Sequence, residues 1–92
     1  MRAIVVTTEK RGVFFGYCED ESTAPEKLVL NNCRMCVYWS AAERGVLGLA
    51  AVGPLDGCRI SNAVDSVTLW QITGIFAASD KAVKRWEDAP WS

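Results

Sequence analysis

The sequence AIVVTTEKRGVFFGYC, residues 3–18, has the pattern of a β-hairpin. Residues 3–8 are rich in β-branched side chains and residues 13–18 in aromatic ones, and both kinds of side chain are enriched in strands. The connecting residues 9–12 have the composition of a turn and end in glycine. The segment therefore predicts two paired strands at the start of the chain.

Further strand candidates surround a pair of asparagines. Residues 19–26 are acidic and small and contain a proline, which indicates an exposed loop. Residues 27–30 and 36–39 are strand candidates, and the asparagines within 31–35 tolerate a left-handed backbone, so that this segment suits a turn or a bulge. For residues 40–45 the sequence favours a loop over a single helical turn.

The second half of the chain has less regular patterns. Residues 46–52 are apolar and rich in glycine and alanine, so as a strand they would lie where another segment approaches closely. Residues 53–57 give a strong turn signal, after which residues 58–60 resume an extended segment. Residues 67–76 alternate over most of their length and form the longest strand candidate.

Only the C-terminal segment has the signals of a helix. Ser79 is a suitable N-cap, and Asp80 favours the positive end of a helix. Ala82, Val83 and Trp86 lie on one stripe of such a helix. The sequence therefore predicts one short helix at the end of the chain.

Together these elements indicate one mainly β domain. A chain of 92 residues has room for a single domain. We expect a β-rich core over residues 1–78 and a C-terminal helix over residues 79–88. Several short strands separated by turns, followed by one terminal helix, are typical of a small antiparallel barrel or sandwich.

The apolar content is high for so short a chain. Hydrophobic residues make up 50% of it, with 4 Trp, 3 Phe and 2 Tyr. A domain of this size buries only about 60–65% of the surface that its unfolded chain exposes. We therefore expect a homo-oligomer. Trp86 and Trp91 are the interface candidates, since a tryptophan near a terminus docks either on its own sheet or on a neighbouring subunit.

Charge and residue usage exclude several classes of function. Lys and Arg number 10 against 11 Asp and Glu, which gives a net charge of -1. General DNA binding is disfavoured, because proteins that bind duplexes usually carry a basic excess. The chain has no histidine, which removes the commonest general base and the Ser–His and Cys–His nucleophile pairs. We expect a protein that is not an enzyme and uses no cofactor.

No segment has the pattern of a secretory signal or a membrane span. Met1 and Arg2 lead directly into the first predicted strand. The weakly polar segments 45–55 and 66–79 are shorter than the ~20 apolar residues that a span needs, and glycine, proline or polar residues interrupt them. We expect a cytoplasmic protein whose four cysteines are free thiols.

Cys33 and Cys36 have the spacing of a metal-binding pair. Two thiolates this close can share an ion if a turn brings them together, and Cys18 and Cys58 would complete a four-thiolate zinc site. Those two cysteines are isolated in the sequence, however, and Cys36 leads directly into a strand candidate. Because free cysteine is often a small core residue, the sequence favours four structural thiols, with zinc as the alternative.

Aromatic and arginine side chains suggest a site for a planar anionic ligand. Rings would stack on a base, and guanidinium groups would hold a phosphate through forked hydrogen bonds. The alternative is that the rings belong to the core or to an interface and that the arginines are solvated. The candidate ligand-binding residues are Arg34, Tyr38, Trp39, Arg44, Arg59 and Trp70.

Several segments of the chain resemble a known family. They are VVTTE at 5–9, RGVFFG at 11–16, NCRMCVYW at 32–39, GVLGLAAVGP at 45–54 and GCRI at 57–60. These segments resemble a family of small uncharacterised proteins encoded by tailed bacteriophages and prophages. The resemblance covers nearly the whole chain and implies a phage accessory protein that acts in the host cytoplasm. Small phage proteins of this kind often counteract host defences by binding a protein or by sequestering a nucleotide signal.

Three hypotheses about function follow. The first is a non-enzymatic homo-oligomer that sequesters a small anionic ligand, such as a nucleotide second messenger, at sites between subunits. The second is a protein-interaction or structural module that docks a host defence protein or a virion protein without any small ligand. The third is a small domain stabilised by zinc.

Overall fold

The fold is a curled antiparallel sheet with two short helices on its outer side. The computed structural model describes residues 2–9, 12–19, 26–39, 45–55 and 57–90. The elements in chain order are β1 (Arg2–Thr8), β2 (Val13–Cys18), β3 (Lys27–Tyr38), α1 (Gly45–Ala51), β4 (Arg59–Ile60), β5 (Val64–Trp70), β6 (Ile72–Ala77) and α2 (Asp80–Asp88). The molecule is therefore mainly β, and its last element is the predicted C-terminal helix.

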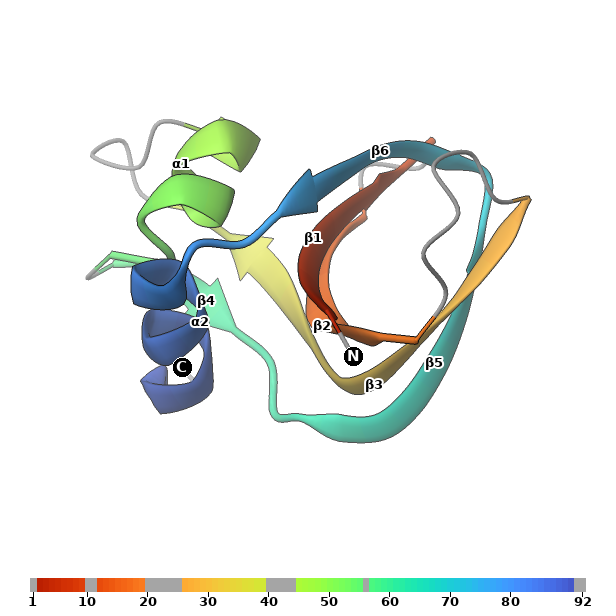
Figure 1. Ribbon diagram of the computed structural model, residues 1–92. Coiled ribbons are helices and arrows are strands. Elements are labelled where there is room, and N and C mark those ends of the chain that lie inside the picture. Colours follow the sequence, from red (N-terminus) through yellow and green to blue (C-terminus); the bar gives the residue numbers. More distant parts are fainter. Residues whose placement is uncertain (1, 10–11, 20–25, 40–44, 56, 91–92) are drawn as a thin grey trace.

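The strand order forces the sheet to curl. β1 lies between β2 and β6, and β3 pairs with the other side of β2. β4 and β5 both pair with β3, so β5 and β6 lie toward opposite ends of the strand order. Only Gln71 separates β5 from β6 along the chain, and the sheet must therefore bend round until these strands meet at a corner, as Figure 1 shows. The sheet does not close into a barrel.

The predicted hairpin at the start of the chain is confirmed. β1 and β2 are antiparallel, and Val5 lies opposite Phe15 in their register. The turn is held by two bonds: the Thr8 amide donates to the Gly12 carbonyl at 3.0 Å, and the Gly12 amide donates to the Thr8 hydroxyl at 3.2 Å. A β-branched strand and an aromatic strand thus pair locally, as their sequences indicate.

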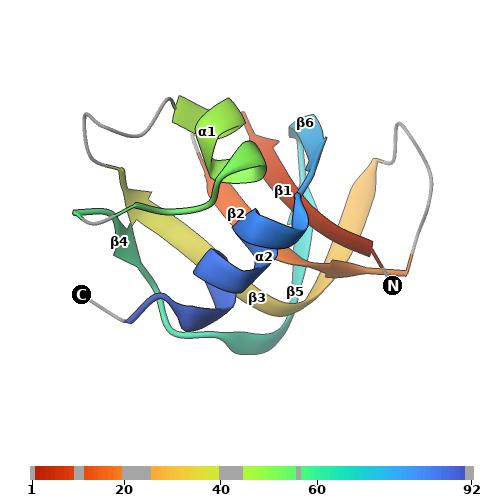
Figure 2. The same cartoon turned by 60° about the vertical axis from the view of Figure 1, so that its left-hand side comes forward.

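The hairpin strands are buried on both faces, which divides the core in two. The inner core lies within the curl and contains Ile4, Val6, Cys18, Leu28, Leu30, Cys33 and Leu69. The outer core lies between the sheet and the helices and contains Val5, Val13, Phe15, Cys36, Leu49, Ala50, Ile60, Ala82 and Trp86. Figure 2 shows the two helices in front of the sheet, where they cover the outer core.

The prediction of two strands between residues 27 and 39 is wrong, because β3 is one strand of 12 residues. One of the two asparagines nevertheless adopts the left-handed backbone that the sequence indicated. Asn32 has a φ of 49°, and the pairing with β2 shifts register between Phe15 and Tyr17. The left-handed residue therefore forms a bulge instead of a turn, and β3 continues past it.

Residues 46–52, for which the sequence left a strand open, are largely helical, because Gly45–Ala51 forms the helix α1. Leu49 and Ala50 are buried in the outer core, and Val46 packs against it. These positions follow the i, i+3, i+4 spacing of a helix face, but seven residues are too few to distinguish that spacing from a continuous apolar run. The glycine and alanine residues of this segment, which suggested a close approach to a strand, instead belong to a helix that packs on the outer core.

The extended segment at residues 67–76 is divided by a corner. Gln71 has a φ of 56°, and its carbonyl accepts a hydrogen bond from the Glu9 amide at 3.0 Å. Val64–Trp70 pairs with β3, whereas Ile72–Ala77 pairs with β1. The prediction of one long strand is therefore wrong. The alternating pattern continues through the corner, so the pattern alone does not reveal the change of partner.

The predicted C-terminal helix is confirmed with its cap. The Ser79 hydroxyl accepts from the Ala82 amide at 3.0 Å and donates to the Ala51 carbonyl at 2.7 Å. This second bond ties the start of α2 to the end of α1. The predicted turn at residues 53–57 precedes the short strand β4, as expected, with Gly53 at a φ of 90° and Gly57 at 95°.

Trp86 anchors α2 within its own chain. Its side chain is fully buried and stacks on Phe15, with ring centroids 5.1 Å apart, and its indole nitrogen donates to the Leu49 carbonyl at 3.0 Å. Trp86 therefore docks on its own sheet and offers no surface to a neighbouring subunit, which corrects its assignment as an interface candidate. Trp91, residues 40–44 of the predicted loop at 40–45 and most of the acidic loop at 19–26 lie outside the described residues.

Candidate functional site

The structure does not bring all the described candidates for the predicted ligand site together. Arg34 is only 8% exposed, and its Nε donates to the Ser61 carbonyl at 2.8 Å. Its Nη1 donates to the Trp86 carbonyl at 2.6 Å and to the Glu87 carbonyl at 3.4 Å. Burial lowers the pKa of this guanidinium group. Arg34 thus caps the C-terminal end of α2, and its assignment to a phosphate is wrong.

The exposed aromatic residues lie at opposite ends of β3. Tyr38 is opposite Arg59 in the pairing with β4, and Trp39 is the next residue in the chain. Trp70 is opposite Lys27, at the other end of this 12-residue strand. Trp70 therefore cannot join Tyr38 and Trp39 around one ligand on the same molecule. Arg44 lies outside the described residues.

The four cysteines divide between the two cores. Cys18 and Cys33 belong to the inner core, whereas Cys36 belongs to the outer core and Cys58 packs against it. All four are free thiols, and burial raises the pKa of Cys33 to about 11. The alternating direction of side chains along β3 thus separates Cys33 from Cys36. A single zinc site made from all four thiolates does not fit this arrangement.

A pocket lies between α2 and the segment that connects α1 to β4. Its volume is about 700 Å³, within the range of roughly 300–1,000 Å³ that is usual for ligand sites. We call it the α2 pocket. It is lined by Pro54, Leu55, Gly57, Cys58, Ile60, Lys81, Lys84, Arg85, Asp88, Ala89 and Pro90.

Local sequence builds both walls of the α2 pocket. Gly53, just before the lining residues, lies so close to α2 that a Cβ there would be 2.7 Å from the Arg85 Cβ and 2.9 Å from the Ala82 carbonyl. After this contact Pro54 and Leu55 form the apolar wall opposite the helix. The Cys58 amide donates to the Leu55 carbonyl at 3.2 Å, which closes the turn between them.

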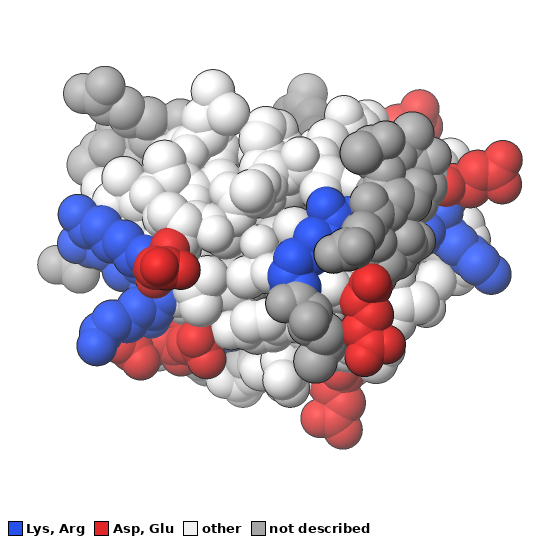
Figure 3. Space-filling model, viewed as in Figure 1, with Lys and Arg blue, Asp and Glu red and all other residues white. Residues whose placement is uncertain are grey.

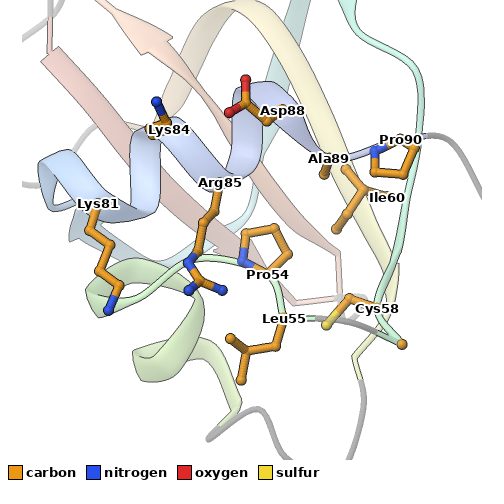
Figure 4. A pocket seen from close by; sticks show the side chains of 11 residues that line it. Pro54, Leu55, Cys58, Ile60, Lys81, Lys84, Arg85, Asp88, Ala89 and Pro90 are labelled. Atoms are coloured by element: carbon orange, nitrogen blue, oxygen red, sulfur yellow. The ribbon is translucent and has the colours of Figure 1, made fainter.

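The polar wall of the α2 pocket is mostly positive. Three cations and one carboxylate line it. Lys81 and Arg85 are one helical turn apart and point toward Pro54 and Leu55, while Lys84 points away from that segment (Figure 4). Neither Lys81 nor Arg85 is paired with a carboxylate among the described residues, although Figure 3 shows basic and acidic groups next to one another over α2. The pocket thus combines an apolar wall with two positive charges that form no ion pair among the described residues.

The sequence contained a signal for this site that our predictions did not use. Lys81, Lys84 and Arg85 have the i, i+3, i+4 spacing of one helix side, and the helix itself was predicted. The opposite wall could not be placed, because it depends on how residues 53–60 pack against α2. The prediction therefore placed the ligand site at aromatic and arginine residues elsewhere in the chain.

The described residues give few other candidate sites. No group of three or more His, Cys, Asp or Glu side chains in the described part of the chain is arranged to hold a metal ion. Within the same residues, no helix is long and apolar enough to cross a bilayer. The α2 pocket is consequently the best-defined candidate site.

Comparison with known proteins gives a family but no activity. No curated protein and no solved structure shows significant similarity to the chain. The family model of a domain of unknown function, DUF6948, matches residues 1–86, which include the whole sheet and most of the α2 pocket. The chain therefore belongs to the DUF6948 family.

Proposed function

We propose that this protein is a non-enzymatic binding protein that holds a small anionic ligand in the α2 pocket. The observation that carries the proposal is the position of Lys81 and Arg85, which face an apolar wall across a pocket of about 700 Å³ without carboxylate partners among the described residues. Opposite charges strengthen binding most where part of the ligand is removed from water. An anion with an apolar portion can pair with the two cations and pack against the apolar wall at the same time.

The pocket lining defines the chemistry of this ligand. The guanidinium group of Arg85 can form forked hydrogen bonds to a phosphate or a carboxylate, and Lys81 supplies a second positive charge one turn away. Pro54, Leu55 and Ile60 offer apolar contacts for the rest of the molecule. None of the described lining residues is aromatic, so these residues would hold a nucleotide through its phosphate and by contacts with aliphatic side chains instead of by stacking.

The lack of histidine supports binding over catalysis. Burial or hydrogen bonding accounts for the shifted pKa values of Tyr17, Cys33 and Arg34, which lie outside the pocket lining. Active sites commonly contain groups whose pKa is tuned for proton transfer, and the chain has no histidine to serve that purpose.

The biological role that we propose follows from the family resemblance. The segments that resemble small proteins of tailed bacteriophages and prophages imply a phage accessory protein, and a binding protein without catalysis would act by sequestration. We propose that the α2 pocket withdraws an anionic signal, such as a nucleotide second messenger, in the host cytoplasm. The oligomer that we expect would increase the number of sites in each assembly.

A panel of anions tests the pocket directly. We expect a nucleotide or another phosphate or carboxylate with an apolar portion to raise the melting temperature of the protein. At a ligand concentration 100 times the dissociation constant, the stabilisation is about 2.7 kcal/mol, which corresponds to roughly 10 °C or more for a domain of this size. Differential scanning fluorimetry over the panel, followed by calorimetric titration, measures the effect.

Matched helix variants identify the site of binding. Arg85→Gln and Lys81→Gln remove the two charges that face the apolar wall, and each should weaken binding about tenfold or more, as expected for a charge-assisted hydrogen bond. Lys84→Gln removes the same charge from the same helix but at a side chain that points away, and should have a much smaller effect. Equal effects of all three variants, or no ligand in the panel, would contradict the proposal.

A second candidate function is interaction with another protein. Several large apolar side chains in the described part of the chain are exposed, among them Val37, Tyr38 and Trp70. Large exposed apolar patches commonly mark interaction surfaces. Capture of one host or virion protein by the wild-type protein, without any effect of Arg85→Gln, would favour this candidate over ligand binding.

A further inference from the structure

The α2 pocket offers charged and apolar groups but few neutral hydrogen-bonding ones. Apart from Lys81, Lys84, Arg85 and Asp88, its described lining consists of aliphatic residues, glycine, proline and one cysteine. None of these described residues has a hydroxyl, amide or imidazole side chain, and a thiol is only a weak donor. The neutral part of the lining is therefore close to a hydrocarbon surface.

The main chain of this neutral part adds few further partners for a ligand. Pro54 and Pro90 have no amide hydrogen to donate. Ile60 is buried, and its backbone belongs to the pairing of β4 with β3. The Leu55 carbonyl already accepts from the Cys58 amide at 3.2 Å. Side chains and main chain of the described lining thus present mainly hydrocarbon here.

The cations and part of the apolar lining lie toward different ends of the α2 pocket. Lys81 belongs to the first turn of α2, whereas Ala89 follows its last residue, Asp88. Figure 4 shows Lys81 on one side of the pocket and Ile60 with Ala89 on the other. From Lys81 to Asp88 the helix rises about 10 Å. An extended ligand can therefore place an anionic group at the cations and an uncharged part several ångströms away.

This arrangement favours a hydrocarbon chain over a nucleoside as the uncharged part. The edges of a base and the hydroxyl groups of a sugar lose their hydrogen bonds to water when they are buried, and burial is costly unless the protein replaces those bonds. A methylene chain has no such groups, and its transfer out of water is favourable. The Asp88 carboxylate points away from Pro54 and Leu55 in Figure 4, so it does not oppose an anion there.

We propose that the ligand of the α2 pocket is an anion with one aliphatic chain, such as a medium-chain carboxylate or an alkyl phosphate. Its head group binds Lys81 and Arg85, and its chain lies along Leu55 toward Ile60 and Ala89. Carboxylate and phosphate heads are equivalent at this level, because a guanidinium group binds both. The inference rests on the proposed binding function and narrows its ligand from anions in general to those with an aliphatic chain.

Octyl phosphate and adenosine monophosphate are matched probes, because both carry a phosphate monoester and differ only in the group attached to it. We expect calorimetric titration to give octyl phosphate a dissociation constant at least about tenfold lower. Carboxylates from butanoate to decanoate provide a second series. Each added methylene should lower the dissociation constant about two- to fourfold until the chain fills the pocket.

Two substitutions separate the chain from the head group. Leu55→Ser removes apolar contact and should reduce the gain in affinity for each methylene, whereas Arg85→Gln should weaken every member of the series by a similar factor. Leu47→Ser is the matched control, because Leu47 is an exposed leucine of α1 that does not line the pocket. It should leave the series unchanged. Circular dichroism confirms that each variant is folded.

The outcomes distinguish this inference from the proposed function. Binding of adenosine monophosphate as tight as that of octyl phosphate, an affinity independent of chain length, or equal effects of Leu55→Ser and Leu47→Ser would overturn the aliphatic ligand but leave an anion site in place. Failure of the alkyl anions and the nucleotide alike to bind would contradict the proposed function as well.

Discussion

The guanidinium group of Arg34 joins two segments that are distant in the sequence. It donates to the Ser61 carbonyl before β5 and to the Trp86 and Glu87 carbonyls in the last turn of α2. The free carbonyls at the C-terminal end of a helix carry partial negative charge, and a cation there satisfies them. Arg34 therefore contributes to stability through acceptors that are all backbone groups.

Replacement of Arg34 should destabilise the fold. Arg34→Met keeps most of the apolar stem but leaves buried carbonyl groups without their donors, and we expect a loss of about 2–3 kcal/mol in the free energy of unfolding. Urea denaturation measures the loss. The exposed substitution Lys84→Met should change stability by less than about 0.5 kcal/mol. Equal stability of Arg34→Met and the wild type would contradict this role.

Two side chains should make the protein sensitive to alkaline pH. Burial, together with a hydrogen bond to Glu87 and the charge of that carboxylate, raises the pKa of Tyr17 from 10.0 to about 12, and burial raises the pKa of Cys33 from 9.0 to about 11. Both groups are more acidic in the unfolded chain, so the folded state holds more protons between pH 9 and pH 12. Stability should therefore fall as pH rises through this window.

Urea denaturation between pH 8 and pH 11 measures this dependence, and single variants separate the two groups. Cys33→Ala should remove the part of the loss that begins near pH 9, and Tyr17→Phe the part that begins near pH 10. Either variant will have its own stability at neutral pH, so the slope against pH is the quantity to compare. Slopes identical to that of the wild type would show that these groups do not control alkaline unfolding.

The misassignment of Arg34 shows what residue types alone cannot reveal. In the sequence, Arg34 and Arg59 are equivalent candidates for a phosphate. The packing of α2 over the sheet buries Arg34, whereas Arg59 is exposed. Similarly, the spacing of Cys33 and Cys36 suits a metal on a turn but not on a continuous strand, where odd spacing places the two thiols in opposite cores.

The elements that sequence patterns predicted correctly are those fixed by local interactions. The hairpin of β1 and β2 has matched strands around a short turn, and α2 has a capping serine with a stripe of apolar residues. The corner at Gln71 and the helix α1 depend on distant partners. Gln71 accepts from Glu9, and α1 packs against α2, so neither feature has a sufficient local signal.

Two glycines offer a direct test of how closely α2 packs. Gly45 and Gly53 both have positive φ, 68° and 90°, so an alanine at either is strained. Nothing lies within 4 Å of a Cβ added at Gly45, whereas at Gly53 it would meet Arg85 and the Ala82 carbonyl. We expect Gly45→Ala to cost about 1 kcal/mol and Gly53→Ala about 2–4 kcal/mol.

Chemical denaturation of the two variants provides the comparison. Because the contact at Gly53 sets the width of the α2 pocket, Gly53→Ala should also weaken ligand binding, while Gly45→Ala should not. Equal losses of stability would indicate that α2 can move away from residues 53–54 without cost, and the pocket would then be less well defined than the structure indicates.

The whole molecule has a separate core on each face of its sheet. The curled sheet encloses the inner core, and the helices complete the outer core on the other face. The α2 pocket forms at the edge of the outer core. Prediction of a compact β-rich domain with a helical tail was therefore sufficient for the architecture, but not for the position of the site, which lies between two elements that only tertiary packing brings together.

The most direct test of the binding function is mass spectrometry of small molecules released from natively purified protein. We expect denaturation of the wild-type protein to release an anionic compound in near-stoichiometric amount, and the Lys81→Gln/Arg85→Gln variant, purified in the same way and shown to be folded, to release little of it. Release of the same compound in equal amount from both proteins would contradict binding in the α2 pocket.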